Sequence, residues 1–413
     1  MSAKQRSEKS SGQSITGSPY DPISSSIPFS SDQPAEFFLQ FPAAPAVFVL
    51  RGTKEEAEPY VSKTANLRRR LQRLLASAEG QSKRLNLRER VASIQYFLTG
   101  SDFESGVLLY RLLRKEFPQT YQKRLRLHPA SVIKLNLENA FPRAYVTTRL
   151  SRPGARSLYY GPFRSRVVAE KFMNDSLDLF KIRRCTFELN PDPSFPGCVY
   201  SEMKMCLAPC FKGCTDEAYA AEVARVQAYF DSGGESLVQE LEAERDRLSA
   251  ALDFEAAAQQ HAKIAKVKSI LTSADEICRR LDNLDAVIIQ PGAEKDAAAL
   301  FRFTGGALLG PVPLKVAAEQ NVEVEPLEQK LRAALETLIP ANSHSATQMT
   351  EELAILKRWY YRSHKAGEVV FAKAEGELPM RKLMNAVHRI AQPKQENTKD
   401  PKEHETSGDA ASQ

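Results

Sequence analysis

The sequence predicts an α+β chain made of several small domains rather than one large one. Its 413 residues exceed the length that a single hydrophobic core ordinarily holds. Short segments with strand and helix periodicity are mixed before residue 215 and again after residue 280, whereas residues 216–275 have helical periodicity. The composition, 42% hydrophobic and 26% charged, is that of a globular protein. We therefore predict two mixed α/β units separated by a cysteine-rich module and a helical hairpin.

Two classes of protein are excluded at this stage. No run approaches the roughly 18 apolar residues that a membrane span needs. The first residues are polar and basic, with no apolar stretch behind them and no small-residue cleavage site, so they do not resemble a secretory signal. We expect a cytoplasmic protein that does not enter a membrane.

Changes in composition predict the domain boundaries. Both ends are polar, and we expect them to be disordered because they hold too few apolar residues for a core. The predicted segments are a Ser-rich tail (1–34), a small α/β unit (35–122), a strand and helix region with the cysteines (123–215), a helical region (216–275), an α+β unit (280–390) and a second tail (391–413).

The first α/β unit is basic. Its helix from Asn66 to Ala78 places three leucines on one face and arginines elsewhere, as a surface helix requires. Between Lys63 and Arg126 there are 15 Lys or Arg against 5 Asp or Glu. Such a local excess suits a polyanion such as nucleic acid, and its alternative is a basic face that contacts only water. The other predicted elements are strands at Val47–Leu50, Pro59–Val61 and Ala92–Leu98 and a helix at Phe103–Phe117.

The middle of the chain is predicted from strand signals, a loop and a cysteine cluster. We expect strands at Ser131–Leu137 and Ala144–Thr148, a loop at Leu158–Phe163 and a helix at Ser165–Phe180. In a reducing compartment, clustered cysteines indicate metal binding before disulfides. Four thiolates can hold zinc or an iron–sulfur cluster, and the paired C-x2-C spacing common in zinc sites is absent. The four candidate ligands are Cys185, Cys198, Cys206 and Cys210.

The helical region and the last unit complete the prediction. Leucines at 237, 241, 248 and 252 have the spacing of a helix that packs on another helix, and a second amphipathic helix follows Phe254, so the two can close as a hairpin. An ordinary structural hairpin is the alternative to one that binds a partner. From Ala286 to Gly310 strand segments meet at a Gly-Gly turn, and helices are expected at Pro326–Leu338 and Glu351–Ser363.

Four short motifs carry a family resemblance. Tyr60-Val-Ser-Lys63 followed by Asn66-Leu-Arg-Arg-Arg70 resembles the second half of the GIY-YIG nuclease signature. That segment, Tyr-Gly-Pro-Phe at 160–163, Cys206-Leu-Ala-Pro-Cys210 and Leu252-Asp-Phe-Glu-Ala-Ala-Ala258 occur in the same order in the UvrC family, the nuclease subunits of bacterial nucleotide excision repair. The resemblance covers about residues 38–310. It is to a short UvrC with a degenerate GIY-YIG domain and without the C-terminal RNase H-like nuclease domain.

The resemblance implies roles for several residues of the first unit. Tyr60, Lys63 and Arg70 match the catalytic positions, whereas Phe48 stands where the family has its first tyrosine and Tyr110 where it has the metal-binding glutamate. A neutral phenol is a poor ligand for Mg²⁺. We therefore expect a DNA-binding surface with impaired cleavage, which would need Mg²⁺ or Mn²⁺ only if active. The expected DNA contacts are Arg68, Arg69 and Arg73.

The resemblance also implies a cofactor and a partner. It assigns a [4Fe–4S] cluster to the four cysteines and a UVR element to the hairpin, which in the family pairs with UvrB. The implied partner contacts are Leu252, Phe254, Glu255 and Ala258. The resulting hypothesis is a UvrC-like repair protein that binds damaged DNA with UvrB and incises 3′ of the lesion if it cleaves at all. The alternatives are a non-catalytic adaptor that binds DNA and a UvrB-like protein, or a regulator built from the same modules.

Overall fold

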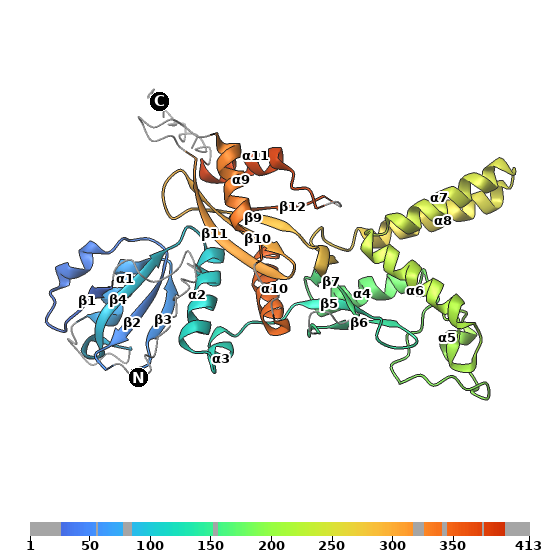
Figure 1. The fold of residues 1–413 in the computed structure, drawn as a ribbon, viewed down its shortest axis with the longest axis horizontal. Helices are drawn as coiled ribbons and strands as arrows, with labels where there is room; N and C mark the ends of the chain where they lie inside the picture. The colour runs from blue at the N-terminus through green and yellow to red at the C-terminus, as the bar shows by residue number, and fades with distance from the viewer. Residues whose placement is uncertain are drawn as a thin grey trace, which may run out of the picture.

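The computed structural model describes residues 26–54, 57–76, 85–151, 156–316, 326–340, 345–373 and 376–392. This part of the chain holds three four-stranded antiparallel sheets with helices packed on them, and a long helical pair extends from one end (Figure 1). The predicted α+β class with several units is therefore confirmed. No helix in the described ranges is long and apolar enough to cross a membrane.

The N-terminal unit, residues 26–126, has one sheet with helices on both faces. In spatial order its strands are β1 (Ile27–Pro28), β4 (Val91–Leu98), β2 (Ala46–Gly52) and β3 (Tyr60–Thr64). Its helices are η1 (Ala35–Gln40), α1 (Leu67–Leu75), η2 (Arg88–Arg90), α2 (Asp102–Glu116) and α3 (Tyr121–Leu125). Because side chains alternate along β2, Phe48 and Leu50 pack on the α1 side and Val47 and Val49 on the α2 side.

The prediction of a disordered tail over residues 1–34 is wrong for its last part. Strand β1 pairs with β4, and Phe29 is buried against Phe37 and Phe38. The Arg88 guanidinium donates hydrogen bonds to the carbonyl oxygens of Ser31 and Gln33. The composition of this segment does not predict these contacts, because an otherwise polar segment is ordered by one aromatic residue and by an arginine that is distant in the sequence. Residues 1–25 of the predicted tail lie outside the described part of the chain.

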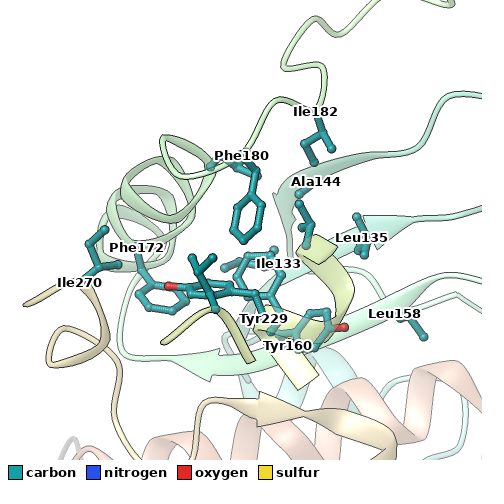
Figure 2. Close-up of a cluster of buried hydrophobic side chains, with 14 of the residues drawn as sticks. Ile133, Leu135, Ala144, Leu158, Tyr160, Phe172, Phe180, Ile182, Tyr229 and Ile270 are labelled. Carbon is teal, nitrogen blue, oxygen red and sulfur yellow. The ribbon is translucent and has the colours of Figure 1, made fainter. Parts of the chain in front are cut away.

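The middle unit, residues 127–280, has a second sheet covered by helices. Its strands, in spatial order, are β6 (Arg143–Thr147), β5 (Ser131–Asn136), β7 (Leu158–Phe163) and β8 (Arg279–Arg280). Its first helices are α4 (Arg166–Leu177), α5 (Val199–Glu202) and η3 (Pro209–Phe211). Aromatic side chains from the sheet, α4 and the next long helix gather in one core, in which Tyr160, Phe172 and Tyr229 are seen together (Figure 2).

The segment Leu158–Phe163 is a strand, so its prediction as a loop is wrong. All six of its residues are buried, and it pairs with β5 through a bulge between Ser131 and Ile133. The glycine and proline that suggested a loop mark this irregular pairing. Gly161 has a φ of 151°, and a Cβ there would lie 3.0 Å from the Val132 side chain. Glycine is therefore needed where the two strands approach.

The helical pair follows the cysteine region. Its helices are α6 (Asp216–Asp231), α7 (Glu235–Ala250) and α8 (Phe254–Leu271), and α7 and α8 pack side by side as an arm directed away from the sheets (Figure 1). Gly234 precedes α7 with a φ of 93°, and a Cβ there would lie 2.5 Å from the Leu271 side chain. This glycine allows α7 to start directly against the end of α8.

The C-terminal unit, residues 281–392, places one helix against the N-terminal unit. Its elements are η4 (Leu281–Asn283), β9 (Ala286–Pro291), β10 (Ala297–Thr304), β11 (Ala307–Lys315), α9 (Leu327–Thr337), α10 (Ala346–Tyr360), β12 (Glu368–Phe371) and α11 (Met380–Ala391), with sheet order β11-β10-β9-β12. Helices α9 and α11 cover one sheet face. On the other, α10 shares a core with α2. Beyond Gln392, the tail predicted for 391–413 lies outside the described residues.

Candidate nucleic-acid interface and cysteine cluster

Tyr60, Arg70 and Phe48 lie together on the α1 side of the N-terminal sheet. The Arg70 guanidinium donates a hydrogen bond to the Tyr60 hydroxyl over 3.0 Å, and the rings of Phe48 and Tyr60 are 6.1 Å apart. Asn66 caps α1 by accepting a hydrogen bond from the Arg69 amide, so Arg70 falls in the first turn of the helix, beside the end of β3. The Arg70 Nε is buried without a partner. The structure thus assembles two of the three matched nuclease positions.

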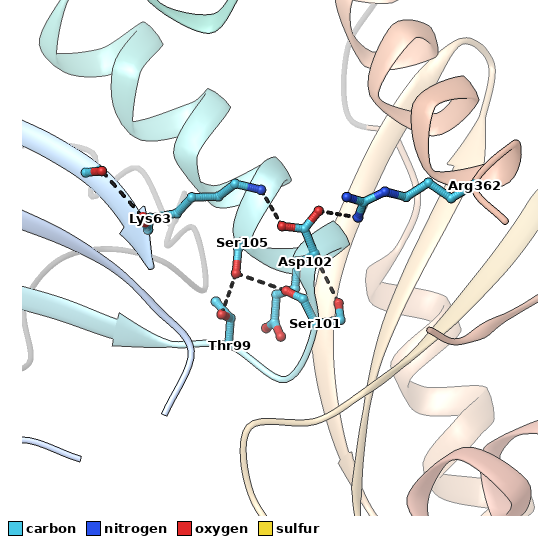
Figure 3. A network of polar contacts seen from close by, with 8 residues as sticks. Lys63, Thr99, Ser101, Asp102, Ser105 and Arg362 are labelled. Carbon is cyan, nitrogen blue, oxygen red and sulfur yellow. Dashed lines mark hydrogen bonds and ion pairs between the residues drawn. The ribbon is translucent and has the colours of Figure 1, made fainter. Parts of the chain in front are cut away.

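Lys63, the third matched position, points toward α2 instead. Its Nζ contacts the Asp102 carboxylate at 2.5 Å, and the second oxygen of Asp102 accepts from Arg362, also at 2.5 Å (Figure 3). Burial acts to raise the pKa of Asp102, but the hydrogen bond and charge of Lys63 and the charge of Arg362 outweigh it and hold this pKa below its ordinary value. The Asp102 carboxylate therefore links Lys63, near the end of β3 in the N-terminal unit, to Arg362, which follows α10 in the C-terminal unit.

Tyr110 is buried at the contact between α2 and α10. Its hydroxyl donates a 3.0 Å hydrogen bond to Glu351 and accepts one from Arg114. The same Glu351 carboxylate accepts from the Tyr121 hydroxyl at 3.0 Å and from the Gln122 amide at 2.8 Å. Burial, followed by the charges of Glu352 and Glu351, raises the pKa of Tyr110, so the phenol stays protonated and acts as a donor.

This arrangement does not fit a divalent metal ion at Tyr110. The Glu351 carboxylate already accepts hydrogen bonds from three neutral donors, Tyr110, Tyr121 and Gln122, and the phenol of Tyr110 supplies no anionic oxygen. In the described ranges no group of three or more His, Cys, Asp or Glu residues is placed to hold a metal ion. Tyr110 also belongs to the core shared with α10, whereas Tyr60 packs with the core on the α1 side.

The three arginines expected to contact DNA differ in their surroundings. Arg68 donates a hydrogen bond to the Phe41 carbonyl over 2.7 Å, which ties α1 to the segment before β2. Arg69 and Arg73 are exposed on α1. The structure therefore gives Arg68 a structural contact and leaves the other two available to a polyanion.

The four candidate cysteine ligands influence one another. Burial raises the pKa of Cys206 to about 11, and the charges of Cys185, Cys210 and Cys198 add to this effect. The Ala208 amide donates to the Cys206 sulfur over 3.3 Å, in a loop where Ala208 and Lys212 have positive φ. None of the six cysteines is joined to another by a disulfide. Among the described residues the four sulfur atoms do not converge on one point, so a metal centre at these cysteines stays a prediction.

The expected partner contacts lie at the free end of the helical pair. Leu252 is 73% exposed and Phe254 is 65% exposed, and Glu255 and Ala258 are exposed beside them. Leu252 has a φ of 60°, and the Asp253 carboxylate caps α8 by accepting from the Ala256 amide. Two large apolar side chains that lie next to each other and are exposed to solvent are typical of a surface that contacts another protein.

Sequence analysis missed Glu351, Asp102 and Arg362 as parts of the site. Asp102 follows the capping Ser101 and resembles an ordinary helix-start acid. Glu351 lies 241 residues from Tyr110 in the chain, so no local pattern connects them. Only the packing of α10 on α2 brings these groups together.

Comparisons with known proteins find a family match within the middle unit. Residues 130–229, which include the four cysteines, match the family described as UvrC/Cho excinuclease, middle domain. The chain is similar to proteins named UvrABC system protein C from Moorella thermoacetica (26% identity over 67% of this chain and 44% of the relative), Desulforudis audaxviator (25%, 79% and 53%) and Dehalococcoides mccartyi (23%, 84% and 56%). It spans about half the length of the curated relatives it matches. No solved structure matches it.

Proposed function

We propose that the chain takes part in nucleotide excision repair, because residues 130–229 match the UvrC/Cho excinuclease middle-domain model and the chain is similar to proteins named UvrABC system protein C. In this role it binds damaged DNA together with a UvrB-type protein. The observation that carries the proposal is the coexistence, in one chain, of that middle domain, a basic N-terminal unit and an arm with an exposed apolar tip.

DNA binding is assigned to the N-terminal unit. The exposed Arg69 and Arg73 lie on α1, and Arg70 and Tyr60 form a pair near the same helix. Arginine contacts to phosphate oxygens bind DNA without reading its sequence and position the protein on it. This suits a protein that must accept many DNA sequences around a lesion.

Cleavage 3′ of the lesion is proposed to be weak or absent. Hydrolysis of a phosphodiester by this kind of site uses a divalent ion to neutralise phosphate charge. Tyr110 supplies a buried, protonated phenol where a carboxylate would be required, and the nearest carboxylate, Glu351, is occupied by three donors. The chain's own residues thus support holding the phosphate more than breaking its ester bond.

The same observation favours a second candidate, a non-catalytic adaptor. In that case the phenol of Tyr110 serves only to dock α10, and the N-terminal unit delivers DNA to a partner. The two candidates differ in one measurable property, which is residual metal-dependent incision.

The cysteines are proposed to hold a [4Fe–4S] cluster. Cys185, Cys198, Cys206 and Cys210 would be its ligands, and the cluster would fix the long loop between α4 and α6. Spectroscopy tests this directly. Protein purified without oxygen should show broad visible absorbance with four irons per chain, and a colourless protein with stoichiometric zinc would contradict the assignment.

The tip of the α7 and α8 arm is proposed to bind the UvrB-type partner. Phe254 would be the apolar anchor, and the exposed Ala258 permits close approach of a partner helix. Charged groups such as Glu255 would surround that contact.

An incision assay tests the proposed function. The purified chain is incubated with a UvrB-type protein and a duplex carrying one lesion, with Mg²⁺ or Mn²⁺, and both binding and cleavage are followed. Arg70→Ala is compared with Arg381→Ala, which changes an exposed arginine on α11. We expect binding and little incision. Robust incision abolished by Arg70→Ala alone would overturn the impaired-cleavage proposal, and the absence of binding to both DNA and partner would overturn the repair role.

A further inference from the structure

A cavity of about 110 Å³ lies between the N-terminal and C-terminal units. Its walls come from the end of β3, from α2 and α3, and from α10 with the residues that follow it. Figure 3 shows its charged side, where Asp102 lies between Lys63 and Arg362. The cavity is therefore formed only when α10 is docked on α2.

The polar wall of the cavity is strongly cationic. Its lining has four basic side chains, Lys63, Arg124, Arg358 and Arg362, and one carboxylate, Asp102; Arg124 is paired with Glu58, which lies outside the lining. Arg358 is exposed and has no ion-pair partner among the described residues, while Arg362 remains 46% exposed despite its contact with Asp102. Surface cations that outnumber their counter-ions in a concave site attract an anion. A phosphate group satisfies this requirement because it can accept from two guanidinium groups at once.

The opposite wall is apolar and rigid. Phe103 and Trp359 lie with ring centroids 5.2 Å apart, and the Trp359 indole N–H donates to the Ala366 carbonyl over 2.9 Å, which fixes the ring. Leu109 and Ile355 complete this wall. Phe103 and Trp359 are only 5% and 4% exposed, so this wall offers a base apolar contact rather than an open stacking face. Apolar contact for the base beside cations for the phosphate suits a single-stranded nucleotide.

Gly106 keeps the cavity open. It lines the cavity from the middle of α2, and a Cβ added there would meet no atom within 4 Å. Glycine inside a helix costs roughly 1 kcal/mol relative to alanine, and no packing or positive φ demands it here. The missing side chain is thus space that a ligand can occupy.

We propose that this cavity binds one nucleotide of an unpaired DNA strand, with its phosphate at Arg358 and Arg362 and its base against Phe103 and Trp359. Asp102 is the internal counter-ion that holds Lys63 and Arg362 in place until the phosphate arrives. A base paired in a duplex cannot enter so small a space, so the site selects opened DNA. The inference rests on the proposed function for the identity of the ligand.

The proposal is tested by fluorescence anisotropy with the full chain. Labelled single-stranded and duplex oligonucleotides of equal length are titrated at several salt concentrations. Arg358→Ala removes one phosphate contact, so the slope of log affinity against log salt should fall by roughly 0.7 for the single strand. Gly106→Leu fills the cavity without changing charge, so it should weaken single-strand binding by about fivefold or more at unchanged slope. The control is Arg381→Ala, which changes an exposed arginine on α11 at the other face of the sheet. Any effect of this control on affinity or on the salt slope should be the same for the single strand and for the duplex.

A competition arm separates a DNA strand from a free nucleotide as the ligand. Deoxyadenosine monophosphate and inorganic phosphate are added to the complex of the chain with the single strand. Weak competition by both, with loss of binding in Gly106→Leu and Arg358→Ala, supports the proposal. Strong competition by the mononucleotide would overturn the assignment to a strand in favour of a free nucleotide.

The remaining outcomes separate this site from the proposed function. Normal single-strand binding by both folded variants would overturn the cavity while leaving DNA repair intact. Failure of the unchanged chain to bind any DNA would overturn both. Circular dichroism monitors folding, and if Gly106→Leu does not fold, the exposed position of Arg358 keeps the test decisive.

Discussion

Removing the Glu351 carboxylate should undock α10 from the N-terminal unit. Glu351 is 8% exposed and accepts hydrogen bonds from Tyr110, Tyr121 and Gln122 at 2.8 to 3.0 Å. A hydrogen bond to a charged group contributes about 1.5–3 kcal/mol, and bonds that share one acceptor do not add fully. In Glu351→Ala the proton of the buried Tyr110 hydroxyl would also lose its acceptor, because Arg114 is a donor too.

We therefore expect Glu351→Ala to lower the free energy of unfolding by about 3–4 kcal/mol. Glu351→Gln, which keeps the shape and one acceptor, should lose about half as much. Tyr110→Phe should cost about 1–2 kcal/mol, since Tyr121 and Gln122 still satisfy the carboxylate. In the double variant with Glu351→Ala, the Tyr110 change should have almost no further effect, which corresponds to a coupling energy of about 1 kcal/mol or more.

The assay uses the single tryptophan of the chain. Trp359 lies on α10, two turns after Glu351, and packs against Phe103 of α2. Its fluorescence in a urea titration therefore reports docking of this helix. Glu328→Ala, which removes an exposed glutamate paired with Arg332 in α9, is the matched control and should cost no more than about 0.5 kcal/mol. If Glu351→Ala costs no more than this control, the carboxylate does not hold the two units together.

Three further predictions concern the same contact, the arm and the pH response. Tyr110→Glu should destabilise the α10 contact and leave incision unrestored, because it places a second carboxylate against Glu351. Adding Glu351→Gln to this variant should recover most of the loss in the urea midpoint. A gain of incision in the Tyr110→Glu single variant would contradict this reasoning. Phe254→Ala should leave thermal stability within about 0.5 kcal/mol while weakening co-purification with a UvrB-type protein, whereas Ala250→Ser, before the tip, should change neither. The pKa of Asp102 is depressed below 3.8, so its contribution to docking should be present above that pH and lost as the pH falls through the depressed value. Asp102→Asn should remove this acid-dependent part of the Trp359 fluorescence change. An unchanged acid transition in this variant would count against the ion pairs of Asp102 with Lys63 and Arg362.

Local sequence patterns predicted the helices and strands in which buried apolar residues recur at regular spacing. Leu67, Leu71 and Leu74 recur at helical spacing, and all three are buried in α1. The cysteines could be singled out because thiol chemistry is specific and their spacing is short. Patterns failed where long-range packing overrides local composition: β1 is ordered by Phe29 and a distant arginine, and β7 is a strand although glycine and proline lie within it.

The position of Tyr110 shows how far motif register can lead. The register places a phenol where the family resemblance expects a carboxylate, and a neutral phenol is a poor ligand for Mg²⁺. The register cannot say what the phenol does instead. In the fold, a carboxylate is present beside Tyr110 after all, but it comes from α10 and is used as a hydrogen-bond acceptor. The Tyr110 hydroxyl is thus a hydrogen-bond donor that closes the contact with the C-terminal unit. The same packing of α10 on α2 forms the cavity that Lys63 and Arg362 line, so the Tyr110 hydrogen bond and the cationic cavity depend on one contact between the two units.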